Sequence, residues 1–186
     1  MQPATGLRSL VAAAVLSLGA SLAGAGHSTM YLNNLEMTVQ NRLAQIGPSP
    51  KGAAKREASL LRNAIRVLHR PTAKLSADIA CFADTLVYLQ RISNPVPQLP
   101  QAASTTVSWF RGAVESRAAD CTDAVAEYAA QGGKPAVLRT LRKKLDAAAA
   151  AIARVGSATH LSDAVRNLRK AAAADEKAFA ILDSVR

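Results

Sequence analysis

Apolar residues recur at steps of three and four through most of this chain, and this spacing constrains the fold more than any other feature. Between Leu75 and Leu89 the apolar positions follow one another at steps of 4, 3, 4 and 3. Such spacing places them on one face of an α-helix that packs against a neighbouring helix. The chain has no run of alternating β-branched residues long enough to indicate a strand. The pattern therefore predicts an all-α protein.

Glycines and prolines divide this pattern into about five helices. Pro71 falls inside the second helix, where it removes a backbone N–H donor and restricts the residue before it. We therefore expect that helix to kink or break near Pro71. The fourth helix opens with Pro135 in its first turn, where proline costs least. The expected helices cover residues 28–46, 53–92, 104–131, 135–155 and 161–182.

The stretch SNPVPQLPQ, residues 93–101, separates the second and third expected helices. Its three prolines favour an extended inter-helix loop with polyproline character. The other connections are short, which implies antiparallel neighbours in an up-and-down bundle. The length suits one hydrophobic core, so we expect residues 28–186 to form a single helical-bundle domain.

Residues 1–25 have the layout of a secretory signal peptide. Arg8 is the only charged side chain in this stretch, an apolar run extends from Leu10 to about Leu18, and small residues follow it. The apolar run is shorter than the ~20 residues that a membrane-spanning helix requires. We therefore expect a cleaved signal peptide, a secreted or periplasmic protein, and no membrane span in the mature chain.

The chain has two cysteines, Cys81 and Cys121. Oxidation is allowed in an exported protein, so a structural disulfide between them is the expected state. If the helices on either side of the proline-rich loop form a hairpin, these two positions lie nearly opposite each other. No CxxC or His-rich tract accompanies them, so we expect no metal site.

Positive charge is concentrated in parts of the chain. The chain carries 23 Lys and Arg against 13 Asp and Glu, which gives a formal net charge of +10. In the second expected helix the basic residues fall on one face, opposite the leucines, and the fourth and fifth helices repeat this arrangement. The segment from Thr72 to Gly133 is more acidic than basic. The candidate binding residues on the second and fourth helices are Lys55, Arg62, Arg66, Arg70, Arg139, Arg142 and Lys143.

A segregated basic surface favours anionic partners. The candidates are an anionic polymer, a lipid headgroup or an acidic protein. Nucleic acid is disfavoured because the protein is expected to be exported and has no aromatic residues interleaved with the basic ones for base stacking. The competing interpretation is that these are ordinary solvated helix faces. If the stripes lay on different sides of the molecule, each would bind only loosely.

No catalytic motif is present. The three histidines, His27, His69 and His160, have no partner four residues away, so a HExxH zinc site is excluded. There is also no haem-attachment motif, phosphate-binding glycine loop or GxSxG elbow. We therefore expect no enzyme activity and no cofactor. The leading hypothesis is an exported, non-enzymatic interaction or structural protein that binds an acidic envelope component or partner protein. The alternatives are a small-ligand carrier with a hydrophobic cavity in the bundle, and an enzyme of unfamiliar design.

One charged residue interrupts the apolar stripe of the fifth expected helix. Asp175 falls on that stripe, where an unpaired charge is costly to bury. We expect either that this end of the helix is exposed or that Asp175 meets a basic partner.

Overall fold

The computed structural model describes residues 30–94 and 96–185, and within them it is all-helical. This confirms the predicted all-α class. The predicted signal peptide lies outside the described residues, as do His27 and residues 28 and 29 of the first expected helix. The six helices of the described part are α2 (Met30–Ile46), α3 (Gly52–Leu68), α4 (Leu75–Leu89), α5 (Leu99–Ala130), α6 (Pro135–Gly156) and α7 (Leu161–Val185).

The expected second helix is two helices, because Pro71 breaks it rather than kinks it. α3 ends at Leu68, where the N–H of His69 still donates to the carbonyl of Ile65 over 3.1 Å. Pro71 has no N–H to continue that series, and α4 begins only at Leu75. The described chain therefore has one helix more than the five expected.

The proline-rich loop is shorter than predicted, and the expectation that residues 93–101 are non-helical is wrong for its last three residues. α5 begins at Leu99 rather than near Ser104. Pro100 lies in the first turn of α5, where a backbone N–H has no helical partner and its absence costs little. The carbonyl of Gln98 already accepts the N–H of Ala102 at 3.0 Å.

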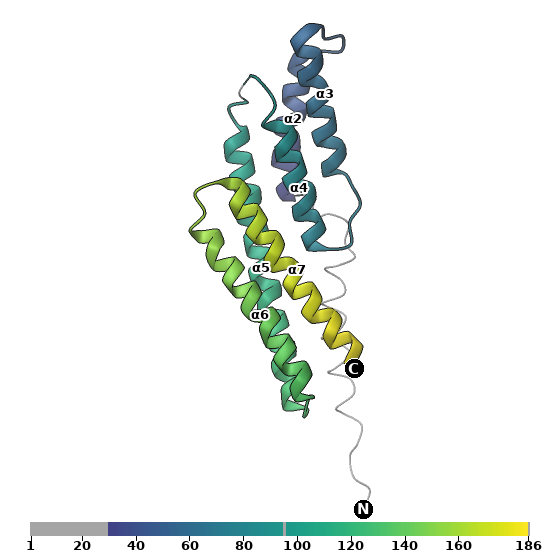
Figure 1. Cartoon of the computed structure of the whole chain (residues 1–186). Helices are drawn as coiled ribbons and strands as arrows, with labels where there is room; N and C mark the ends of the chain where they lie inside the picture. The colour runs from purple at the N-terminus through teal and green to yellow at the C-terminus, as the bar shows by residue number, and fades with distance from the viewer. Residues whose placement is uncertain (1–29, 95, 186) are drawn as a thin grey trace, which may run out of the picture.

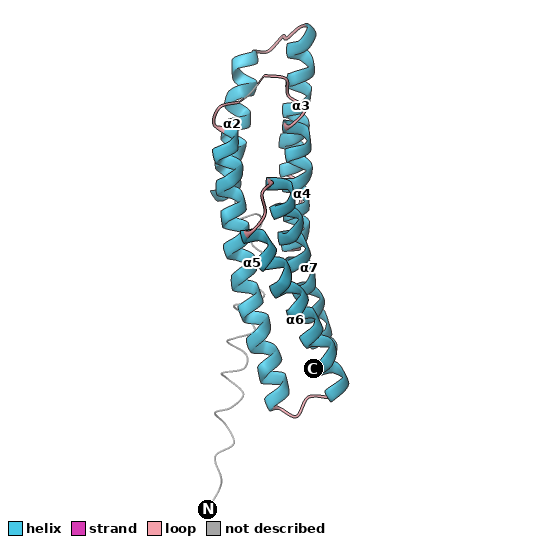
Figure 2. Cartoon of the chain, turned by 60° about the vertical axis from the view of Figure 1, so that its left-hand side comes forward, coloured by secondary structure: helices cyan, strands magenta, loops and turns pink. Residues whose placement is uncertain are grey.

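The helices form an elongated body along α5 (Figure 1). α2, α3 and α4 lie at one end with the first part of α5, and α6 and α7 lie towards the other end, also seen from the second direction in Figure 2. α7 packs against α4, α5 and α6. None of the described helices has the length and apolar composition needed to cross a membrane.

The core has a large and a small part, and α5 contributes to both. In the large part, Phe82 of α4 and Phe110 of α5 are fully buried with ring centroids 5.6 Å apart. Trp109 packs edge-on against Phe110 at 5.4 Å, so it belongs to the core. The small part lies among α5, α6 and α7, and its buried residues are Cys121, Val125, Leu141, Ala178 and Leu182.

A sharp turn joins α2 to α3 at the upper end of the molecule in Figure 1. Gly47 ends α2 with φ of 82°, a left-handed conformation that glycine adopts without the penalty of a side chain. Pro48 follows and cannot continue the helix. The apolar stripe of α2 is buried at Leu35 and Val39, but Leu43 near this turn is only half-buried.

Candidate functional site

All seven predicted basic residues are exposed. Four of them, which we call the α3 basic face, lie on α3 or just after its end, and three lie in the first half of α6. Figure 1 shows α3 and α6 towards opposite ends of the elongated body. The structure therefore keeps the four basic residues of the α3 segment apart from the three on α6. The α3 basic face consists of Lys55, Arg62, Arg66 and Arg70.

The carboxylate of α3 points away from this face. Glu57 is the only acidic residue between positions 51 and 70, and it is buried, with 7% of its surface exposed. Its carboxylate accepts a hydrogen bond from Nε of Arg42 at 2.6 Å and another from Nδ2 of Asn94 at 3.2 Å. The charge of Glu57 is therefore balanced inside the fold. Arg42 and Asn94 gave no signal in the sequence, because they come from other helices and loops.

Most of the α3 basic face has no neutralising partner. Lys55, Arg62 and Arg66 form no ion pair with any other residue in the described ranges. Arg70 lies 3.7 Å from Asp84, but both side chains are more than half exposed, and such surface pairs contribute little. The neighbouring His69 contacts Glu36 at 2.9 Å. The field over α3 is therefore positive.

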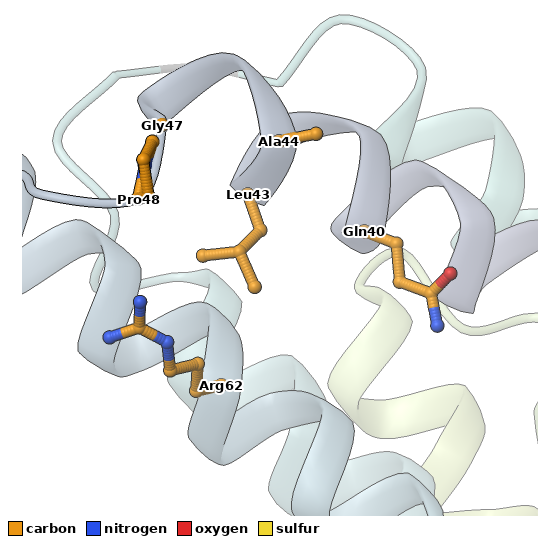
Figure 3. A pocket seen from close by; sticks show the side chains of 6 residues that line it. All are labelled: Gln40, Leu43, Ala44, Gly47, Pro48 and Arg62. Carbon is orange, nitrogen blue, oxygen red and sulfur yellow. The ribbon is translucent and has the colours of Figure 1, made fainter.

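A hollow of about 390 Å³ lies beside this face, between the end of α2 and α3. Figure 3 shows Leu43 projecting into the space between the helices and Arg62 extending along its opposite side. The hollow is open to solvent. Sequence reasoning missed it, because it arises from the way α2 ends. Its lining residues are Gln40, Leu43, Ala44, Gly47, Pro48 and Arg62.

A second, smaller hollow of about 260 Å³ lies between α3 and α4. Val87, which is 46% exposed, lines it together with Arg70 and Arg91. Both hollows are surface depressions. Neither is the enclosed apolar cavity that a ligand carrier in the bundle interior requires.

The predicted disulfide between Cys81 and Cys121 is wrong, since both thiols are free. The error lies in the register of the assumed hairpin. Phe82, next to Cys81, packs at the level of Phe110 of α5. Cys121 follows Phe110 by 11 residues, about 16 Å along the helix axis. A disulfide requires Cα atoms within about 7 Å.

Burial raises the pKa of both thiols. For Cys121, which is fully buried, the pKa rises to about 11, and the charge of Asp175 adds to the effect of burial. For Cys81 burial is again the main cause, with the Arg70 guanidinium working against it. Thiols of this kind are poor nucleophiles, because the reactive thiolate is scarce near neutral pH.

Asp175 is fully buried, so of the two predicted alternatives the exposed helix end is wrong, and the basic residue near Asp175 is Arg117. Burial raises the pKa of its carboxyl to about 6, the charge of Arg117 lowers it, and Glu176 raises it further. Neither carboxyl oxygen of Asp175, nor Nε of Arg117, has a hydrogen-bond partner among the described residues. The Arg117 guanidinium lies 5.4 Å from the centre of the Phe179 ring. The buried carboxylate of Asp175 therefore has Arg117 as a nearby opposite charge, but these polar atoms lack hydrogen-bond partners within the described part of the chain.

Glu176, beside Asp175 on α7, has a clear structural role. Its carboxylate accepts the backbone N–H of Ser76 at 2.9 Å and the hydroxyl of Ser76 at 2.6 Å. These bonds satisfy a free N–H in the first turn of α4 and place a negative charge at the positive end of that helix. Glu176 therefore links α7 to the first turn of α4 through two hydrogen bonds.

The described part of the chain shows no group of three or more His, Cys, Asp or Glu side chains arranged to hold a metal ion. Comparison of the chain with protein-family models, with curated proteins and with solved structures gives no match. The chemistry of the α3 basic face and its hollow is thus the basis for assigning a function.

Proposed function

We propose that this protein is an exported, non-enzymatic helical interaction protein that binds an acidic partner through the α3 basic face. One observation carries the proposal. Among the described residues, Arg62, Arg66 and Lys55 are exposed without a carboxylate partner, while the only carboxylate of α3 is turned inward and held by Arg42. A surface from which the opposite charge has been removed attracts anions more strongly than a mixed one.

The strength of this attraction limits the kind of contact. Each Lys or Arg near an anionic surface contributes about 1 kcal/mol, so four contribute ~4 kcal/mol and give a dissociation constant of about 1 mM. Useful affinity therefore requires either many repeated contacts or an added apolar contribution. α6 lies too far along the body to add its basic residues to a small contact at α3 (Figure 1).

We also propose a cellular location and an order of the helices. The signal-peptide layout of residues 1–25 supports export to a secreted or periplasmic location. The short connections between successive helices support an up-and-down antiparallel order. The alternative of a small-ligand carrier would need an enclosed cavity, whereas the two hollows beside α3 are open.

Charge reversal tests the proposal. We expect Arg62→Glu together with Arg66→Glu to abolish measurable binding of a short sulfated oligosaccharide, because two attractive charges become repulsive. The matched control is Arg139→Glu with Arg142→Glu, which reverses two exposed charges on α6 and should leave affinity within about twofold at 0.15 M salt, where the screening length is about 8 Å. Titration calorimetry measures both. Equal losses for the two variants would refute the proposal, and so would failure of the unmodified protein to bind either this oligosaccharide or anionic vesicles at low salt.

A further inference from the structure

The hollow between α2 and α3 combines an apolar floor with an unpaired cation. Leu43, Ala44 and Pro48 supply apolar surface, and Arg62 supplies the charge on the opposite side (Figure 3). Arg62 has no ion-pair partner among the described residues. The hollow therefore suits a molecule that carries an anionic group next to an apolar one.

The floor is uncovered because the apolar stripe of α2 extends past the core. Leu35 and Val39 are buried at 0% and 2% exposure, but Leu43 and Ile46, which continue the same stripe, are only half-buried. The turn at Gly47 and Pro48 then takes the chain directly back into α3. The apolar end of this helix pair thus lies at an extremity of the molecule, as Figure 1 shows for the α2–α3 turn.

The exposed charged residues around this end are all basic. Lys51, Lys55 and Arg56 are exposed near the start of α3, and Arg62 and Arg66 follow. The only carboxylate in this segment is the buried Glu57. Positive charges spread around an apolar patch are complementary to a surface that presents many identical anionic groups above an apolar layer.

We propose that the α2–α3 end docks on an anionic lipid surface, with a headgroup phosphate against Arg62 and the adjoining apolar part of the lipid against Leu43, Ala44 and Pro48. This inference rests on the proposed function and specifies its acidic partner. An acidic polysaccharide supplies anions but leaves the apolar floor in water. An acidic protein would meet the same surface with a mixed set of side chains, and it becomes an outcome of the test.

Vesicle sedimentation tests this docking with the full chain. The probes are vesicles of phosphatidylcholine alone and of phosphatidylcholine with about 30% phosphatidylglycerol, where anionic lipid creates the negative surface potential. We expect binding to the anionic vesicles only. Arg62→Glu should weaken it about thirtyfold, since each unit of charge at an anionic surface changes affinity about fivefold.

The apolar floor is tested by a second pair of variants. Ala44→Asp places a charge on the floor at an exposed position and should weaken binding at least fivefold. Its matched control is Ala149→Asp, the same change at an exposed alanine of α6, which should leave binding unchanged. Leu43→Gln, checked for folding by circular dichroism, should also weaken binding, because it removes apolar contact without altering charge.

Distinct outcomes separate the two proposals. If the protein binds a short sulfated oligosaccharide through α3 but does not sediment with anionic vesicles, the lipid proposal is wrong and the acidic-partner function stands, with a polymer or an acidic protein as the partner. If Ala44→Asp and Ala149→Asp weaken vesicle binding equally, the hollow is not the contact. If neither probe binds, both proposals fail.

Discussion

At the scale of single residues, Asp175 is the group whose environment is least favourable to its charge. Its carboxyl is fully buried, and its pKa is raised to about 6 from an ordinary value of 3.8. A raised pKa in the folded state means that the folded protein holds its proton more tightly than the unfolded chain does. The stabilising contribution of this group is therefore complete below about pH 4 and is lost as pH rises through 6.

We predict that Asp175→Asn raises the free energy of unfolding at pH 7.5 by on the order of 1–3 kcal/mol, because the amide has the same shape and no charge to bury. At pH 4 the variant and the unmodified protein should differ little. Urea unfolding at the two pH values measures this. A variant that is less stable at pH 7.5 would show instead that the attraction between Asp175 and Arg117 outweighs the cost of burial.

The two thiols give a second test at this scale. We predict that the protein, unfolded without reductant, reacts with a thiol reagent at two positions. In the native protein Cys81, which is half-buried, should react before Cys121, which has no exposed surface and a pKa raised to about 11. Ellman's reagent measures both the number and the order. No reaction until a reductant is added would mean that the cysteines are paired.

At the scale of helices, α5 contains a residue that weakens it. Gly112 lies inside this 32-residue helix, and a Cβ at this position would meet no atom within 4 Å. We predict that Gly112→Ala raises the free energy of unfolding by about 0.5–1 kcal/mol, because alanine loses less backbone entropy on folding. Thermal unfolding measures the gain.

The matched control for this change is Gly133→Ala, just after α5. A Cβ there would lie 2.4 Å from Cε1 of Tyr128 and 2.7 Å from its backbone oxygen. We expect this variant to lower the melting temperature, because the turn between α5 and α6 must shift. If both alanine variants changed stability in the same direction, the packing around α5 would differ from that described.

The sequence predicted the helices well and their pairing poorly. Apolar spacing and breakers depend on local physics, so the break near Pro71 and the start of α6 at Pro135 could be placed correctly. The start of α5 was misplaced, since Pro100 fits a first turn as well as a loop. Register depends on which side chains interlock, and the Phe82–Phe110 contact that sets it has no sequence signal. The predicted disulfide failed for that reason.

The candidate site was predictable in its charges and not in its shape. Lys55, Arg62 and Arg66 share a face by helical spacing alone, and they are exposed as that spacing indicates. The inward turn of Glu57 depends on Arg42 and Asn94, which are distant in sequence. The hollow likewise depends on α2 and α3 meeting at their ends.

At the scale of the whole molecule, charge is arranged along the long axis. The basic residues of α3 and of α6 lie towards opposite ends (Figure 1), and α5 contributes exposed acidic groups at the α6 end, beside the first half of α6. On the second half of α5 these are Asp120, Asp123 and Glu127. If the proposed function holds, such a distribution orients the molecule towards an anionic surface by one end rather than along its side.

The most direct test of the α3 basic face as the binding surface is amide chemical-shift mapping of the 19.4 kDa chain during titration with a short sulfated oligosaccharide. We predict shifts concentrated in residues 51–70, with small changes in residues 135–146 of α6, and the disappearance of these shifts as salt is raised. Shifts confined to α6, or spread evenly over both basic segments, would contradict it.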